Sequence, residues 1–209
     1  MARPSLTQEE IDRFRSRLCE AAIALFATQG YEAVTMRAIA EAMGCSRTLP
    51  YRYFEGKEEI FLEVRARCFE QLIEHQRGAF ESAEQPIERI HALGSGYLEF
   101  ARERRHAFAI MYDLYEVDVP SYPKLAKVIE RAWRLLAAAI KGAIDAGELD
   151  GTTNNLSRLL WSGIHGIAVL EHGGRLGPGP TPADALMRPM IDALIQAHRP
   201  EGYIPTTSH

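Results

Sequence analysis

Apolar residues recur every three or four positions along almost the whole chain, and no stretch alternates apolar and polar residues long enough to indicate a β-strand. Such spacing places the apolar side chains on one face of a helix. The sequence therefore predicts an all-α fold of about nine helices. We expect a small three-helix domain over residues 1–56, a larger helical domain over residues 57–200, and a flexible tail over residues 201–209.

Glycine, proline and capping residues divide this pattern into segments. Thr7 and Gly30 bound the first predicted helix, and Thr35 is a suitable N-cap for a short second helix that ends before Gly44. A third short helix is expected to begin after Ser46, its N-cap. The later helices are expected to begin at Lys57, Pro86, Thr153 and Thr181, the last of them interrupted by Pro189, with a short helix around Phe108 and a long one over residues 125–143 between them.

Composition indicates an ordinary globular protein. Hydrophobic residues make up 46% of the chain and charged residues 25%, and no apolar run reaches the roughly 20 residues that span a bilayer. The first residues lack the apolar stretch of a secretory signal, so we expect a cytoplasmic protein with no membrane contact. Cys19, Cys45 and Cys68 are far apart in the sequence and are expected to be reduced and packed, with a redox-sensing thiol at Cys45 as the alternative.

The overall charge does not favour nucleic-acid binding. The formal net charge is −4 and the isoelectric point is near 6.0, whereas such domains usually carry a basic excess. Residues 35–54 are an exception, because they hold Arg37, Arg47 and Arg52 against Glu41 alone. A small cationic surface is therefore possible within an acidic protein.

The two short helices predicted on either side of Gly44 have the arrangement of a helix-turn-helix, in which the second helix enters a major groove. The residues around them are more specific than the spacing. They read Ala21-Ala22-x-x-Leu25-Phe26-x-x-x-Gly30-Tyr31-x-x-Val34-Thr35-Met36-Arg37-x-Ile39-Ala40-x-x-Met43-Gly44-Cys45-Ser46, and then Tyr51-Arg52-Tyr53-Phe54-x-x-Lys57-Glu58.

This string closely resembles the N-terminal domain of the TetR/AcrR family of transcriptional regulators. A shorter string, Trp161-Ser162-Gly163-Ile164-His165-Gly166, resembles the Trp-His-Gly signature of one subgroup of TetR C-terminal domains. The resemblance implies a sequence-specific DNA-binding regulator that acts as a homodimer on a palindromic operator. It also implies a C-terminal domain that binds a small hydrophobic or aromatic effector and thereby relieves repression. No catalytic residue, metal site or cofactor is expected.

Roles for the DNA-binding residues follow from their chemistry and from the family pattern. Thr35 and Ser46 are expected to position the domain on phosphates beside free backbone amides. Arg47, Thr48 and Leu49 are expected to meet base edges, because arginine pairs with guanine and apolar groups meet the thymine methyl. The remaining candidates, which add charge or hold phosphates, are Arg37, Tyr51, Arg52, Tyr53 and Lys57.

Each of these residues also has a plainer interpretation. Thr35 and Ser46 can be caps alone, and Tyr51 and Tyr53 can be packing residues. Pro50 departs from the family pattern, which has an aliphatic residue there. Because proline disfavours a helical residue before it, the third helix could start late and present Thr48 and Leu49 from a loop.

Two surfaces are expected in the larger domain. Small residues that allow close approach, and apolar residues that supply area, favour a dimer interface, with packing inside one subunit as the alternative. These residues are Leu156, Leu160, Gly163, Ile164, Ile167, Leu186, Met190 and Leu194. An effector cavity would use aromatic residues and a few polar groups, although core packing is the commoner role of such residues. The candidates are Tyr97, Phe100, Phe108, Met111, Tyr112, Trp133, Trp161 and His165.

Two other functions compete with this one. A helical enzyme could use His165 and Glu171 as an acid-base pair, but the two are six residues apart and no nucleophile motif or metal-ligand cluster accompanies them. A DNA-binding protein without a small-molecule effector is the second alternative.

Overall fold

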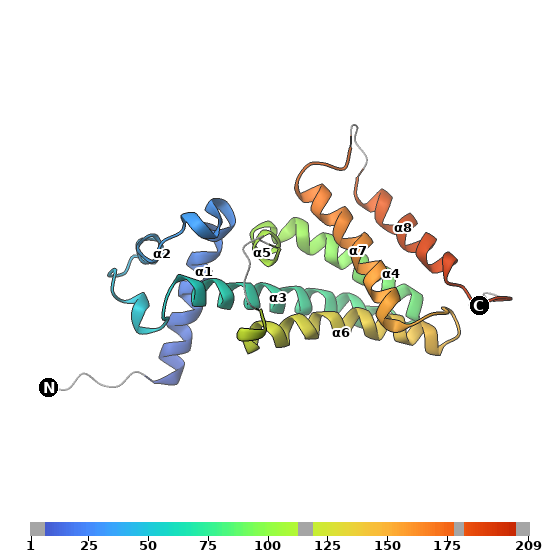
Figure 1. Ribbon diagram of the computed structural model, residues 1–209, viewed down its shortest axis with the longest axis horizontal. Helices are drawn as coiled ribbons and strands as arrows, with labels where there is room; N and C mark the ends of the chain where they lie inside the picture. Colours follow the sequence, from blue (N-terminus) through green and yellow to red (C-terminus); the bar gives the residue numbers. More distant parts are fainter. Residues whose placement is uncertain (1–6, 113–118, 178–181, 204–209) are drawn as a thin grey trace. The chain divides into compact units, whose positions relative to one another are not determined.

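The computed structural model describes residues 7–112, 119–177 and 182–203 (Figure 1). All regular secondary structure within these ranges is helical, which confirms the predicted all-α fold. Contacts divide the chain into two compact units, one formed by residues 1–70 and 106–129 and the other by residues 71–105 and 130–209. Each unit is described by itself below.

The first unit begins with α1, Gln8–Ala33. Thr7 caps it as predicted, and its side chain and that of Glu10 form a reciprocal capping box. Gly30 interrupts the helix with φ 76°, and a short final stretch follows it to Ala33. The buried face of α1 carries Leu18, Cys19, Ala22 and Phe26.

The second helix, α2, spans Met36–Ala42 and is followed by a tight turn. Gly44 adopts a left-handed conformation with φ 64°, and its amide donates to the carbonyl of Glu41. The next amide, of Cys45, donates to the carbonyl of Ala40. These two hydrogen bonds form a Schellman motif, which satisfies the last carbonyls of α2 and turns the chain away from it.

The third predicted helix is wrong in extent. Only a single 3-10 turn, η1 over Pro50–Arg52, follows α2, and residues 46–49 form a non-helical turn. Leu49 is the N-cap of η1 and no side chain caps it, so Ser46 is not the helix cap that the sequence predicted. The reason is Pro50, which occupies the first position of the turn and lacks the amide that an earlier helix start would need.

Four further elements complete the first unit. They are the first half of α3, Lys57–Ser82; most of α5, Arg105–Met111; η2, Val119–Ser121; and the first part of α6, Pro123–Asp145. Phe61 of α3 lies at the centre of the unit, with its ring centroid 5.0 Å from those of both Phe26 and Tyr31. Arg65 of α3 donates two hydrogen bonds, of 3.0 and 2.8 Å, to the carbonyl of Met111 at the end of α5.

The second unit contains α4, Pro86–Glu103; the remainder of α3 and α6; α7, Thr153–His172; and α8, Asp184–Ala197. Helices α4, α7 and α8 pack against one another (Figure 1). Glycines allow their close approach: a Cβ atom at Gly94 would lie 2.6 Å from Ile191, and one at Gly163 would lie 2.5 Å from the Met190 sulfur. These contacts place the core of the unit between the three helices.

The remaining helix predictions are largely confirmed. The described chain holds eight α-helices, close to the expected nine, and the starts at Lys57, Pro86 and Thr153 agree. The last helix begins at Asp184, with Pro189 inside it as expected, and the predicted start at Thr181 lies outside the described residues. Most of the predicted tail, residues 204–209, also lies outside them.

None of the helices in the described ranges is long and apolar enough to cross a membrane. Cys19 and Cys68 are buried, whereas Cys45 is partly exposed, and all three are free thiols. Burial raises the pKa of the Cys19 and Cys68 thiols to about 12, so both remain protonated and pack as small apolar groups.

Candidate nucleic-acid interface

The segment between α2 and α3 presents alternating anchored and exposed residues. Pro50 is buried, whereas the next two residues, Tyr51 and Arg52, are exposed, and 57% of the Tyr51 surface is accessible. Arg47 and Thr48 are exposed on the preceding turn. We call Ser46–Tyr53 the recognition turn, because a buried proline fixes its backbone and leaves long polar side chains pointing outward.

The N-terminus of α2 lies close in sequence to this turn and keeps its predicted cap. The Thr35 hydroxyl accepts a 3.1 Å hydrogen bond from the Ala38 amide. Arg37 is exposed and pairs with Glu41 at 2.7 Å. The hydrogen bond from Arg37, and the nearby charge of Arg47, lower the pKa of Glu41. The two arginines therefore share one carboxylate, and this part of the surface retains a positive excess.

The hydroxyls of Ser46 and Thr48 lie 3.5 Å apart within the turn. Leu49 is partly buried as the residue that leads into Pro50. All three side chains are thus presented from an irregular turn rather than from a helix, which is the outcome expected if Pro50 delays the helix start. Their contacts with bases and phosphates stay predictions.

Two of the predicted phosphate contacts are also packing residues. The ring of Tyr53 stacks on that of Phe14, with 4.1 Å between centroids. The Lys57 amine lies 4.1 Å from the ring centroid of Tyr31 and donates to its carbonyl at 2.8 Å and to that of Glu32 at 3.3 Å. Lys57 therefore satisfies carbonyls in the last turn of α1.

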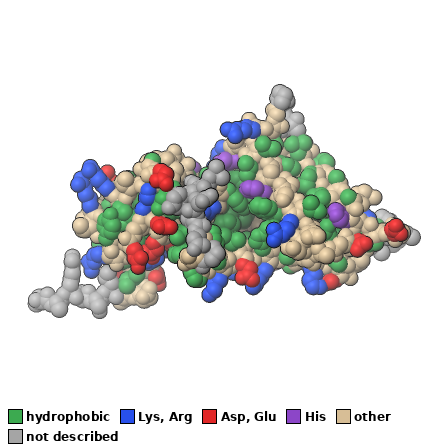
Figure 2. Space-filling model, viewed as in Figure 1, with side chains coloured by type: hydrophobic (Ala, Val, Ile, Leu, Met, Phe, Trp, Pro, Cys, Tyr) green, Lys and Arg blue, Asp and Glu red, His purple; other side chains and the backbone are tan. Residues whose placement is uncertain are grey.

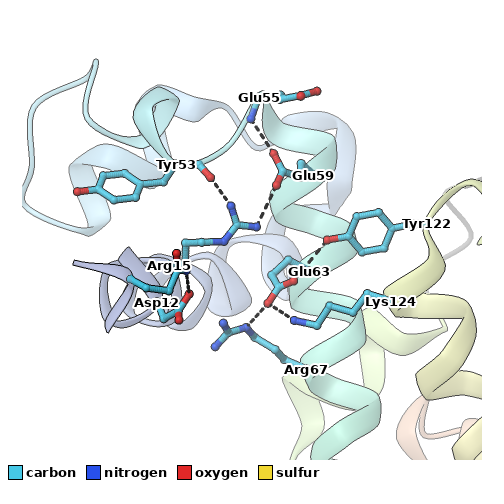
Figure 3. A network of polar contacts seen from close by, with 10 residues as sticks. Asp12, Arg15, Tyr53, Glu55, Glu59, Glu63, Arg67, Tyr122 and Lys124 are labelled. Carbon is cyan, nitrogen blue, oxygen red and sulfur yellow. Dashed lines mark hydrogen bonds and ion pairs between the residues drawn. The ribbon is translucent and has the colours of Figure 1, made fainter. Parts of the chain in front are cut away.

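Arg15, which the sequence did not single out, holds the end of the recognition turn (Figure 3). Its guanidinium donates to the Tyr53 carbonyl, pairs with Glu59 at 2.9 Å, and lies 3.9 Å from the ring centroid of Phe54. Arg15 thereby ties α1 and α3 to the backbone between Tyr53 and Phe54. A lone arginine on an amphipathic helix resembles any solvated residue, so only the structure could identify it.

The predicted effector residues fall into two groups, one in each unit. In the second unit, the Tyr97 hydroxyl lies 2.9 Å from Nδ1 of His165. The Trp161 ring stacks on the imidazole, with 4.9 Å between the ring centroids. The ring centroids of Trp133 and Trp161 are 5.7 Å apart. Burial lowers the pKa of His165, so the imidazole is neutral near pH 7 and its Nδ1 can accept a hydrogen bond from the Tyr97 hydroxyl.

Phe100, also in the second unit, is buried and packs edge-on against His75. The other members of the predicted set, Phe108, Met111 and Tyr112, belong to the first unit. Phe108 and Met111 are buried. The ring centroid of Tyr112 lies 5.3 Å from that of Phe108 and 6.1 Å from that of Phe69. Core packing accounts for the geometry of these four residues.

A second polar cluster in the second unit was not predicted. The Arg102 guanidinium pairs with Glu171 of α7 at 2.7 Å and with Asp184 of α8 at 2.8 Å. Beside it lies a cleft of about 260 Å³, lined by Ala101, Arg102, Arg105, Ala168, Glu171 and His172. Glu171 therefore pairs with arginine whereas His165 contacts Tyr97, and the two do not form the acid-base pair of the enzyme alternative.

Two family profiles match the chain. Residues 18–64 match bacterial regulatory proteins of the tetR family, and residues 90–194 match the tetracyclin repressor-like C-terminal domain. The chain belongs to the TetR family. The first profile covers the recognition turn and the second covers the Tyr97–His165 pair, and members of the family are transcriptional regulators rather than enzymes.

Curated relatives include both repressors and activators. The transcriptional repressor KstR2 of Mycobacterium tuberculosis is 30% identical over 122 residues, which are 58% of this chain and 60% of KstR2. The transcriptional activator FasR of Mycolicibacterium smegmatis is 25% identical over 158 residues, 76% of this chain and 70% of FasR. The chain thus matches less than two thirds of the length of KstR2.

Solved structures share the TetR-family fold. A protein of unknown function from Rhodococcus sp. RHA1 has a TM-score of 0.77 at 22% identity, covering 89% of this chain and 95% of that one. The regulator FadR of Bacillus subtilis, in complex with stearoyl-CoA, has a TM-score of 0.73 at 16% identity, covering 86% and 97%. At these identities the likeness establishes the fold alone.

The residues predicted for the dimer interface of this TetR-family chain are buried or partly buried within the single chain. Leu156, Leu160 and Ile164 are buried, and Gly163 packs against Met190. Ile167, Leu186, Met190 and Leu194 are partly buried. The sequence did not single out the exposed apolar residues of α7, which are Leu159, Val169 and Leu170.

Proposed function

We propose that this TetR-family chain is a sequence-specific DNA-binding transcriptional regulator and that its recognition turn reads the operator. The observation that carries the proposal is the exposure of Arg47, Thr48, Tyr51 and Arg52 on a turn whose Pro50 is buried. Side chains on a fixed backbone can meet base edges without first ordering a loop.

We assign base contacts to Arg47, Thr48 and Leu49, and phosphate contacts to Thr35, Ser46, Tyr51 and Arg52. Arg37 adds positive charge. Tyr53 and Lys57 have contacts within the protein that hold the recognition turn, and we keep them as candidates for phosphate contacts at its edge. Residues 1–56 would form the DNA-binding part and residues 57–200 the regulatory part.

We further propose that the protein acts as a homodimer on a palindromic operator. A single recognition turn makes few contacts, and two related copies would double them on an inverted repeat. Hydrophobic side chains gather over α7 and α8 in Figure 2. On α7, Leu159, Val169 and Leu170 are 47%, 41% and 43% exposed. A symmetric contact through this face would also involve the predicted residues Ile167, Leu186 and Leu194 at its margin.

An apolar effector is the ligand class that the second unit supports best. Tyr97, Trp133, Trp161 and His165 combine aromatic rings with one part-buried polar pair, a mixture typical of small-molecule sites. The stearoyl chain of the stearoyl-CoA bound to B. subtilis FadR is a large apolar group, and so is the ketosteroid for which the regulator KstR2 is named, which supports the same class. By analogy with the repressor KstR2, we propose that the protein represses transcription. The similarity to FasR, an activator, favours the alternative that it activates transcription.

The Trp161–Gly166 string supports membership of the Trp-His-Gly subgroup, which we retain as a proposal.

Selection from a random duplex library tests the proposal without knowledge of the operator. Wild-type protein should enrich an inverted repeat, with half-sites about 10 base pairs apart or a multiple of that spacing. Enrichment of a single half-site would contradict the homodimer, and failure to enrich any sequence would contradict DNA reading. Adding stearoyl-CoA as the first probe should weaken binding to the enriched duplex if the effector is a long-chain thioester.

A further inference from the structure

Three charged residues of α3 form one polar face inside the first unit (Figure 3). Glu59, Glu63 and Arg67 are spaced four residues apart, so they lie in line along the helix. Glu63 is only 3% exposed, and among the residues that the structure describes it is the one charged residue that is buried. We call these three residues the α3 ladder.

The first position of the ladder holds the recognition turn. Glu59 accepts a 2.7 Å hydrogen bond from the Glu55 amide and pairs with Arg15 at 2.9 Å. Arg15 in turn donates to the Tyr53 carbonyl. The backbone at both Tyr53 and Glu55 is therefore fastened to Glu59, once through Arg15 and once directly.

The second position, Glu63, holds the start of α6, and the third position, Arg67, connects Glu63 to α1. Glu63 accepts hydrogen bonds from Lys124 at 2.6 Å, from Arg67 at 2.8 Å and from Tyr122 at 3.4 Å. Arg67 also donates to the Ser16 hydroxyl at 2.9 Å. Ser16 follows Arg15 on α1. Neighbouring residues of α1 therefore contact both ends of the ladder, Arg15 at Glu59 and Ser16 at Arg67.

The charge of Glu63 makes this contact sensitive to its partners. Burial alone would raise its pKa, but the hydrogen bonds from Lys124 and Arg67 outweigh burial and lower it, so Glu63 is ionised near pH 7. A buried carboxylate that loses one of its cations must find another or take up a proton. Withdrawal of Lys124 would therefore draw Arg67 more closely to Glu63, at the expense of its bond to Ser16.

We propose that the α3 ladder couples the first turn of α6 to the recognition turn, with Glu63 and Lys124 as positioning residues. Movement of Lys124 away from Glu63 loosens α1 at Ser16 and Arg15, and this loosens the backbone between Tyr53 and Glu55. The importance of this coupling for DNA rests on the proposed function, whereas the coupling itself is a property of the first unit.

Hydrogen exchange measured by NMR on the full chain without DNA tests the coupling. The informative amides are those of Arg52, which donates to the Leu49 carbonyl, of Tyr53 and Phe54, which donate to the Pro50 carbonyl, and of Glu55, which donates to the Glu59 carboxylate. Lys124→Met removes one cation from a position that is 47% exposed, so the fold should tolerate it. Lys141→Met is the matched control, because Lys141 is also on α6 and also pairs with a carboxylate, Asp145.

We expect the four amides to exchange about threefold faster in Lys124→Met, the factor that corresponds to one lost half-buried ion pair. Lys141→Met should leave them unchanged, and Lys124→Arg should restore the wild-type rates. Unchanged rates in Lys124→Met, or an equal acceleration throughout α7 and α8, would overturn the coupling. Failure of the wild-type chain to bind DNA would contradict only the proposed function, since exchange is measured without DNA.

Discussion

The guanidinium group of Arg15 lies over the ring of Phe54, with 3.9 Å between its central carbon and the ring centroid. It simultaneously donates to the neighbouring Tyr53 carbonyl and pairs with Glu59. Three contacts on one planar group fix where α1 meets the recognition turn, a geometry that lysine cannot reproduce.

Arg15→Met should therefore lower the free energy of unfolding by about 1–3 kcal/mol, the combined value of a charged hydrogen bond and a cation–π contact. It should also weaken DNA binding, although Arg15 touches no DNA in the proposed interface. Chemical denaturation and binding titrations would measure the two effects. Arg13→Gln is the control, since Arg13 is two residues away with a 69% exposed side chain. Equal stability of the two variants would contradict a holding role for Arg15.

Gly44→Ala tests the turn that separates α2 from the recognition turn. A Cβ atom at Gly44 would meet no atom within 4 Å, so the cost comes only from its left-handed φ of 64°. We expect a loss of about 1 kcal/mol in stability. Gly56→Ala should have almost no effect, because its Cβ is equally unobstructed and its φ is not left-handed. If both substitutions cost the same, the turn does not depend on the left-handed conformation.

Much of the fold follows from the sequence, because apolar spacing and caps act locally. Thr7, Thr35 and Pro86 begin helices where the sequence predicts them. Ser46 does not, since Pro50 four residues later removes the amide that an earlier helix would use. The sequence contains both signals, a capping serine and a nearby proline, and in the structure the helical turn begins at the proline.

The candidate sites were less predictable, because they depend on which helices meet. Leu160 and Leu159 are equally apolar in the sequence, yet one is buried and the other 47% exposed. Arg15 and Arg13 likewise differ only in what α3 and the recognition turn place beside them. The aromatic residues expected in the effector cavity come from two units, a division that helical spacing does not encode.

The Tyr97–His165 pair should make the second unit sensitive to acid. Burial lowers the pKa of His165 below its ordinary 6.5, so folding favours the neutral imidazole. The stability from this group is complete above pH 6.5 and is lost as the pH falls through the lowered pKa, where protonation removes the Nδ1 acceptor. Thermal unfolding between about pH 8 and pH 5 should show a smaller decline for His165→Gln than for wild type. An NMR titration midpoint of His165 above 6.5 would contradict this account.

Leu170→Glu should separate the proposed homodimer into single chains of 23.4 kDa. A carboxylate placed in an apolar contact between two copies would be buried without a partner, in both copies at once. Sedimentation velocity of wild type and variant would measure the change. Gln196→Glu on α8 adds the same charge at another exposed position and should leave the dimer intact. A wild-type chain that sediments as a monomer would refute the interface.

The most direct test of the account is the salt dependence of binding to the DNA upstream of the protein's own gene, measured by fluorescence anisotropy. Wild type should bind tightly at low salt and lose affinity steeply as salt rises, whereas the double variant Arg47→Ala, Arg52→Ala should bind about tenfold or more weakly with a shallower slope. Arg134→Ala, which removes a 68% exposed arginine of α6, should bind as wild type does. Equal affinity and equal slope for wild type and the double variant would contradict the claim that the recognition turn reads DNA.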